Sequence, residues 1–151
     1  MDVNREEYYG NSLQPWDVMD DNPFMNINIA NAYKYIARIG IKNPEDINKD
    51  SDKIINYINH FEDTYIKADG KVYTMHDIHI MTQVNDIVYA SAISMDNKEP
   101  LDIRIMRMQC IQLLFVGEFD KPNARDYILK YHKLRSRVLE LTAMVQDHYG
   151  K

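Results

Sequence analysis

The chain has 151 residues, 45% hydrophobic and 27% charged, which is typical of one ordinary globular domain. No apolar run reaches the ~18 residues needed to cross a bilayer, and the acidic residues 2–7 are unlike a signal peptide, so we expect a cytoplasmic protein. The net charge of −5 divides into 9 Lys and Arg against 17 Asp and Glu in residues 1–100, and 9 against 6 in residues 101–151. This asymmetry excludes a uniformly acidic DNA mimic.

Prolines suited to a first helical position divide the N-terminal half into three predicted helices, which begin at Pro15, Pro23 and Pro44. The second is expected to run to Gly40, because glycine takes the left-handed conformation of a C′ residue without steric cost. The third carries acids in its first turn, where the helix dipole favours them, and ends before a turn at residues 68–71.

Three more helices are predicted in the C-terminal half. The first follows an N-cap at Thr74, the second begins at Pro100 and ends near Gly117, and the third runs from Pro122 to Gly150. Apolar residues recur at helical intervals in the last one and are expected in the core: Tyr127, Leu134, Val138, Leu141 and Val145.

The pattern therefore predicts a mostly α, single-domain helical bundle of about six helices. Residues 1–67 would form an N-terminal three-helix unit, and residues 72–151 a C-terminal helical extension packed on it. A strand is the alternative for KVYTM (71–75) and for IRIMRMQCIQLLFV (103–116), where apolar and charged residues alternate at the start. Cys110 lies in the second of these runs and is expected to be a small core residue rather than a reactive thiol.

The densest polar pattern lies in the second predicted helix. At 100° per residue, Asn31, Lys34, Tyr35 and Arg38 fall within about 100° of arc, and Lys42 would join them if the turn after the helix keeps it close. The opposite face is apolar: Ile29, Ala32, Tyr33, Ile36 and Ile39.

Two charges, an amide and a phenol on one helix face suit an anion that also carries hydrogen-bonding groups. Arginine offers a planar fork to phosphate oxygens and lysine a mobile charge, whereas Asn31 and Tyr35 would orient a sugar or base. Nucleotides belong to that class of ligand. The alternative is a solvated face on which Lys34 and Arg38 pair with acids of the next helix, such as Glu45 or Asp46.

A longer pattern surrounds these residues. It comprises Tyr8-Tyr9, Pro15-Trp16-Asp17-Val18-Met19, the run Asn31-Ala32-x-Lys34-Tyr35-Ile36-x-Arg38-x-Gly40-x-Lys42-Asn43, then Glu45-Asp46, Lys53 and Tyr57. This pattern resembles a small family of phage proteins, which includes SaV-like proteins linked to sensitivity to abortive infection and the C-terminal part of a podophage deoxynucleotide kinase. The resemblance covers roughly residues 8–60. Ala30 stands where that family usually has glycine, and Tyr8 where it often has histidine.

The resemblance implies a phage-encoded protein in an infected bacterial host that binds a nucleotide through Asn31, Lys34, Tyr35, Arg38 and Lys42. Phosphoryl transfer is the finer expectation, with the protein acting as a deoxynucleoside monophosphate kinase. None of the five glycines belongs to a Walker A pattern, so such a kinase would need another phosphate cradle. Mg²⁺ would be held by Glu45 and Asp46; without nucleotide chemistry, no cofactor is expected.

Other chemistries have weaker patterns. His76 and His79, with His60, would form a zinc site only if the fold joined them. The acids lack the paired spacing of the helical nucleotide pyrophosphohydrolases. Lys130, Lys133 and Arg137 form a basic stripe on the last helix that is too small for a nucleic-acid footprint, and a solvated face is the simpler interpretation.

The alternative function belongs to a different class. A non-catalytic phage protein would bind a host or anti-phage-defence protein through the C-terminal extension, and the methionine-rich apolar segments there are also compatible with a homo-oligomer. The expected partners are thus a nucleotide, and a host protein or a second copy of the chain. A membrane is not expected as a partner, and neither is nucleic acid.

Overall fold

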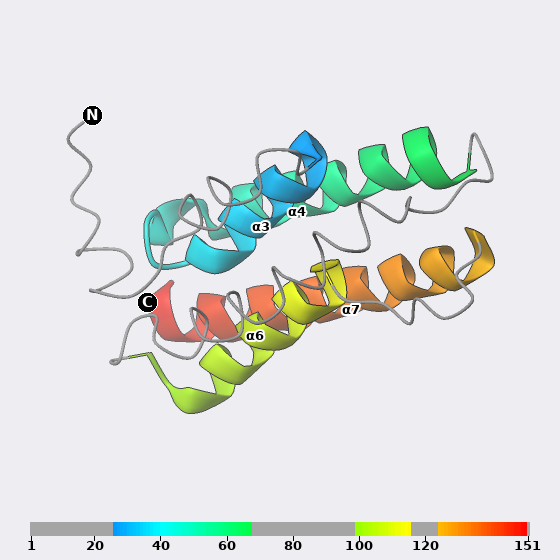
Figure 1. Cartoon of the computed structure of the whole chain (residues 1–151). Helices are drawn as coiled ribbons and strands as arrows, with labels where there is room; N and C mark the ends of the chain where they lie inside the picture. Colours follow the sequence, from blue (N-terminus) through cyan, green and yellow to red (C-terminus); the bar gives the residue numbers. More distant parts are fainter. Residues whose placement is uncertain (1–25, 68–98, 116–123, 151) are drawn as a thin grey trace.

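A computed structural model describes residues 26–67, 99–115 and 124–150, and all of the regular structure in them is helical (Figure 1). The described ranges contain four α-helices: α3 (Ile27–Arg38), α4 (Ile47–Phe61), α6 (Leu101–Phe115) and α7 (Ala124–Tyr149). A 3₁₀ turn, η1 (Pro44–Asp46), leads into α4, and a π-helical segment, η2 (Glu62–Lys67), follows it. The mostly helical fold is confirmed.

The strand alternative is wrong for residues 101–115, which form α6. The alternation of apolar and charged residues at the start of this segment is typical of a strand, but here it has another cause. Ile103 is buried, whereas Ile105 is exposed on the other side of the helix. The helices predicted to begin at Pro15 and Thr74, and the possible strand over residues 71–75, lie outside the described residues. A count of six helices stays a prediction.

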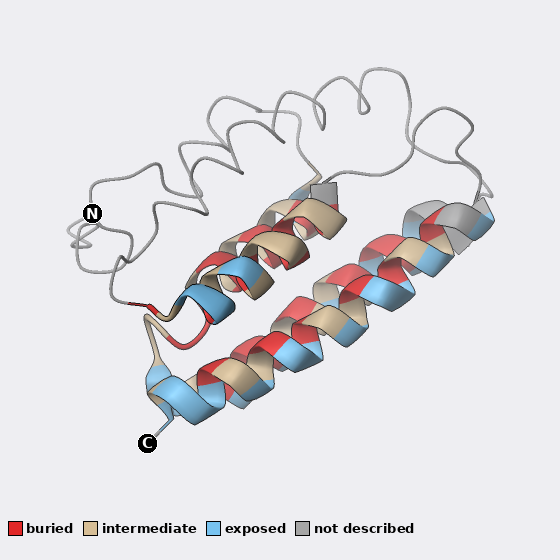
Figure 2. Ribbon diagram, turned by 90° about the horizontal axis from the view of Figure 1, so that it is seen from below, coloured by how far each residue is buried: buried red, intermediate tan, exposed pale blue. Residues whose placement is uncertain are grey.

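The four helices form two layers (Figure 1). Helix α3 packs on α4 in one layer and α6 on α7 in the other, while α4 contacts α7 and α3 contacts α6 across the layers. In Figure 2, buried residues run along the helices of the α6/α7 layer on the side that faces the interior. The second layer therefore covers the apolar faces of α3 and α4.

Helix α3 begins later than the sequence predicts. The side chain of Asn26 accepts a hydrogen bond from the backbone N–H of Asn28 at 2.8 Å, and this N-cap sets the first helical residue at Ile27. The predicted start at Pro23 is therefore wrong for this helix, because the capping Asn26 lies outside the helix and separates Pro23 from its first residue. The predicted end is confirmed, because Gly40 has a φ of 83° directly after the last turn.

Helix α4 follows Pro44 as expected, with the proline in a 3₁₀ turn rather than in the α-helix itself. Its buried side contains two polar residues, Asp50 and Ser51. The hydroxyl of Thr142 on α7 donates to Ser51 Oγ at 2.7 Å and also lies 2.7 Å from the carbonyl oxygen of Val138. A polar contact thus fixes the register of α4 against α7.

The core combines apolar residues from all four helices. The predicted core residues of α7 are all buried, which confirms the helical interpretation of their spacing: Tyr127, Leu134, Val138, Leu141 and Val145. Cys110 is fully buried, as expected, and burial raises the pKa of its thiol to about 12. No helix in the described ranges has the length and apolar content needed to cross a membrane.

Candidate anion-binding site

The polar face of α3 gathers around the ring of Tyr35. Lys34 Nζ lies 5.1 Å from the ring centroid and Arg38 Cζ 4.8 Å, both from the same helix as the ring. Lys53 Nζ reaches the ring from α4, also at 5.1 Å. These distances are typical of cation–π contacts, so one half-buried tyrosine collects three positive charges.

A second tyrosine supports this arrangement from α4. The rings of Tyr35 and Tyr57 stack with centroids 6.2 Å apart and an interplanar angle of 14°. Both side chains are half-buried and pack against the hydrophobic core. Because the stack joins α3 to α4, the cations of the two helices are held on one rigid surface.

Lys42 completes the group that we call the cationic cluster: Lys34, Arg38, Lys42 and Lys53. Burial lowers the pKa of Lys42, and the nearby positive charges of Arg38 and Lys34 lower it further. The backbone N–H of Lys42 donates to the carbonyl oxygen of Arg38 at 3.2 Å, so the turn at Gly40 keeps Lys42 close to the end of α3. A lysine whose charged form is disfavoured by its neighbours gains when an anion arrives.

The alternative interpretation of this face is wrong in its specific pairing. In the described part of the chain, neither Lys34 nor Arg38 has an ion pair with Glu45 or Asp46. Glu45 is instead exposed, and the half-buried Asp46 acts on Asp50 of α4, whose pKa it raises. The charges of Lys34 and Arg38 lie over an aromatic ring and form no ion pair with either acid of η1.

One carboxylate does lie beneath the cluster. Asp50 is 3% exposed, and its Oδ1 is 3.9 Å from Lys53 Nζ, at the outer limit of an ion pair. Burial raises the pKa of Asp50 above its ordinary value, whereas Lys53, Arg38 and Lys42 act to lower it and Asp46 to raise it. The carboxylate is therefore under the cluster without fully neutralising it.

The remaining predicted residues lie at the edges of this surface. Asn31 is half-buried one turn before Tyr35 on the same helix face. Glu45 is exposed and Asp46 half-buried in η1. No group of three or more His, Cys, Asp or Glu residues suited to a metal ion occurs among the described residues, so two carboxylates would have to share Mg²⁺ with the ligand.

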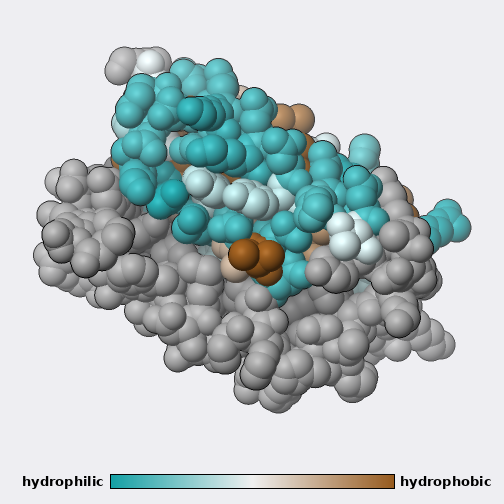
Figure 3. All heavy atoms as spheres, turned by 90° about the horizontal axis from the view of Figure 1, so that it is seen from above, coloured by the Kyte–Doolittle hydropathy of each residue, from teal (hydrophilic) through white to brown (hydrophobic). Residues whose placement is uncertain are grey.

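Figure 3 shows the side of the molecule formed by α3 and α4, and its described residues are mostly hydrophilic. The side chain of Lys53 on α4 is 42% exposed. At least part of the cationic cluster is thus accessible to a charged ligand.

The basic stripe of α7 does not act as one surface. Lys130 lies over the rings of Tyr127 and Tyr131, at 5.5 and 5.3 Å, and points its Nζ at the carbonyl oxygen of Leu114, 3.4 Å away. Arg137 pairs with Glu140 at 3.1 Å on the exposed side, and Lys133 is exposed. Because the charge of Lys130 is directed at α6 and that of Arg137 is paired, the stripe is weaker than its three basic residues indicate.

The fourth basic residue of that segment, Arg135, faces inward. Its Nη1 donates to Asn59 Oδ1 at 3.2 Å and to Glu62 Oε1 at 3.4 Å. His60 is exposed near this contact, whereas His76 and His79 lie outside the described residues. The zinc alternative stays a prediction.

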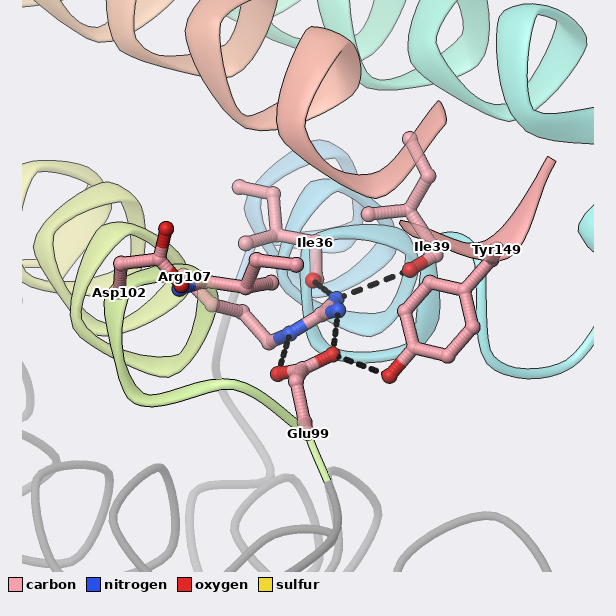
Figure 4. A network of polar contacts seen from close by, with 7 residues as sticks. Ile36, Ile39, Glu99, Asp102, Arg107 and Tyr149 are labelled. Atoms are coloured by element: carbon pink, nitrogen blue, oxygen red, sulfur yellow. Dashed lines mark hydrogen bonds and ion pairs between the residues drawn. The ribbon is translucent and has the colours of Figure 1, made fainter. Parts of the chain in front are cut away.

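Sequence reasoning missed a buried ion pair that holds the turn after α3 (Figure 4). Arg107 on α6 pairs with Glu99, with its Nε 3.2 Å from Oε1 and its Nη2 2.6 Å from Oε2. Its Nη1 donates to the carbonyl oxygens of Ile36 and Ile39, at 2.8 and 3.1 Å. An arginine thereby caps the negative end of α3, next to Arg38 of the cationic cluster.

The sequence contains one indication that Arg107 is buried. Arg107 falls at the helical spacing of three buried residues, Ile103, Cys110 and Ile111, which places it on the core face of α6. A charge on a core face implies a buried partner, but nothing in the pattern identifies Glu99 or the α3 carbonyls as that partner.

Comparison of the chain with protein-family models, curated proteins and solved structures returns no match. The resemblance of residues 8–60 to a phage family therefore stays an expectation from the sequence pattern. What the site can do follows from its geometry.

Proposed function

We propose that the protein binds a nucleotide through the polar face of α3, with Lys34, Arg38 and Lys42 at its phosphate groups. The observation that carries the proposal is the convergence of Lys34, Arg38 and Lys53 on the ring of Tyr35 without a carboxylate paired to Lys34 or Arg38. Like charges held together cost free energy, and a bound anion removes that cost.

The shape of the group favours phosphate among anions. The guanidinium of Arg38 can donate two parallel hydrogen bonds to phosphate oxygens, while the lysines add point charges around it. Asn31 lies one turn away on the same face, where its amide can donate to and accept from a sugar or base. Tyr35 orients the phosphate-binding cations and offers its ring edge to the same ligand.

The finer proposal follows the family resemblance. It makes the protein a phage-encoded, deoxynucleoside monophosphate kinase-like enzyme that acts in the cytoplasm of an infected bacterium. Glu45 and Asp46 would hold Mg²⁺ together with the nucleotide phosphates, and the cations would neutralise charge during phosphoryl transfer. Arg107, which caps the C-terminal end of α3, would hold the turn between the cations of α3 and the carboxylates of η1 in one position.

Calorimetric titration with deoxynucleoside mono- and triphosphates, in the presence of Mg²⁺, tests this function. Selective binding is expected, with at least a tenfold loss of affinity in Arg38→Ala, because charge-assisted hydrogen bonds contribute about 1.5–3 kcal/mol. The matched control is Arg137→Ala, which removes an arginine whose partner is the exposed Glu140. Binding that is absent across the panel, or equal in the two variants, contradicts the proposal.

A second candidate function is supported by a different observation. Four large apolar side chains are exposed on the α6/α7 layer: Leu101, Ile105, Leu129 and Leu139. Such residues are suited to contacts with a host or anti-phage-defence protein, or with a second copy of the chain. A Leu129→Lys, Leu139→Lys variant that loses a host partner captured by the wild-type protein, while retaining nucleotide affinity, would separate this role from the first.

A further inference from the structure

We propose that α4 completes the anion site: Lys53 binds the phosphate as a fourth cation, and Asp50 is the carboxylate that the phosphate replaces, taking up a proton as the ligand binds. This inference rests on the proposed function and adds two residues to it, together with a coupling between ligand binding and protonation.

The position of Lys53 supports its role as a phosphate-binding cation. Its Nζ is 5.1 Å from the Tyr35 centroid, which is the distance of Lys34 Nζ from the same ring on the α3 side. The charges of Arg38 and Lys53 also both act on Asp50, so a ligand at Arg38 is within range of Lys53 as well. The Tyr35–Tyr57 stack fixes the two helices at this point, so Lys53 needs no movement of α4 to take part.

The environment of Asp50 supports its role as the counter-ion that the phosphate replaces. Its carboxylate is buried at 3% exposure, and its distance of 3.9 Å from Lys53 Nζ makes this a loose ion pair with which another anion can compete. A buried carboxylate usually has several hydrogen-bond donors, whereas this one depends on the charge of nearby cations. Asp50 thus serves as an internal counter-ion while the site lacks a ligand.

The charged groups that act on Asp50 come from each neighbouring segment. Arg38 on α3, Lys42 in the turn and Lys53 on α4 favour its ionised form, while Asp46 in η1 and burial oppose it. A phosphate dianion at the cations would add a second negative neighbour and would occupy the cations that favour ionisation. Both changes favour the protonated carboxyl, so a proton moves from solvent to Asp50 as the anion binds.

The experiment uses sulfate as the probe, because sulfate stays a dianion over the pH range in which Asp50 titrates and so contributes no proton of its own. Titrations of the full chain with sulfate are run at one pH in two buffers of different ionisation heat. The wild-type protein is expected to show a buffer-dependent heat that corresponds to the uptake of up to one proton. Asp50→Asn is expected to bind sulfate with no buffer dependence, whereas the exposed neighbour Asp52→Asn behaves as the wild type.

Two lysine variants separate the remaining possibilities. Lys42→Arg keeps a permanent charge, so proton uptake that persists in it belongs to Asp50 rather than to Lys42. Lys53→Met is expected to lower sulfate affinity about tenfold, whereas Lys49→Met, one turn earlier and exposed, leaves it unchanged.

The outcomes distinguish this inference from the function on which it rests. Sulfate or nucleotide binding with equal heats in both buffers, or proton uptake that survives in Asp50→Asn, overturns the inference and leaves the proposed function intact. Unchanged affinity in Lys53→Met overturns the role of Lys53. If neither sulfate nor any nucleotide binds, the proposed function fails, and this inference fails with it.

Discussion

Arg107 on α6 donates a 2.8 Å hydrogen bond to the carbonyl oxygen of Ile36, in the last turn of α3. The arginine side chain is 1% exposed and that of its partner Glu99 is 0% exposed. Tyr149, in the last turn of α7, donates from its hydroxyl to Glu99 at 2.6 Å. One buried charge pair therefore joins α3, α6 and α7 (Figure 4).

Replacing Arg107 with methionine should destabilise the protein strongly. Glu99 would keep its burial and lose its counter-ion, a change that typically costs about 3–5 kcal/mol. Urea denaturation of Arg107→Met measures the loss. The double variant Arg107→Met, Glu99→Gln should recover part of it, because the unpaired charge is gone; a double variant as unstable as the single one would show that the α3 carbonyl contacts dominate.

Gly40 should not tolerate a side chain. Its φ of 83° disfavours other residues, and an added Cβ would lie 2.8 Å from Tyr149 Cδ2 and 3.0 Å from Val145 Cβ. We expect Gly40→Ala to lower the free energy of unfolding by about 2–4 kcal/mol. Gly40→Asn separates the causes, since asparagine adopts positive φ more readily but still carries a Cβ; full stability in Gly40→Asn would contradict the steric part.

Three features show how far the sequence predicts the structure: the end of α3, the polar face of α3 and the buried contact of Arg107. The glycine after α3 could be placed because a helix end has a local signature of its own. The polar face of α3 could be predicted because helical period alone groups Lys34, Tyr35 and Arg38. The contact of Arg107 with the carbonyl oxygen of Ile36 could not, since the two residues are 71 positions apart and meet only through the packing of α6 against α3.

The same limit applies to the site. Lys53 and Asp50 lie on α4, and only the packing of α4 against α3 brings them to the ring of Tyr35. The spacing within one helix says nothing of that approach. Local chemistry was thus predictable from the sequence, whereas the second side of the site and its buried counter-ion required the tertiary structure.

Lys130 should make stability depend on pH in a defined direction. Burial lowers its pKa from 10.5 to about 7 in the folded protein, so between these values the unfolded chain binds a proton that the folded chain does not. The contribution of Lys130 to stability is least favourable below pH 7 and improves as the pH rises toward 10.

Lys130→Met should therefore raise the melting temperature relative to the wild type most at pH 6 and progressively less at pH 8 and 9.5. Lys133→Met, on the exposed side of the same helix, is the control and should show no such trend. A gain in Lys130→Met that does not change with pH would mean that the folded protein keeps the lysine charged, held by the Tyr127 and Tyr131 rings.

Anion binding should be visible as a gain in thermal stability. A ligand that binds only the folded chain adds about 2.7 kcal/mol at a concentration 100 times its dissociation constant. Sulfate also stabilises proteins in general by exclusion from their surface, so the comparison must be between variants.

Two double variants make this comparison. The first, Lys34→Ala with Arg38→Ala, removes two cations of the cluster. The second, Lys49→Ala with Arg137→Ala, removes one lysine and one arginine outside the cluster. We expect the melting temperature of the wild type and of the second variant to rise steeply at low millimolar sulfate, and that of the first to show only the shallow general rise. Equal curves for the two double variants would contradict a specific anion site at Tyr35.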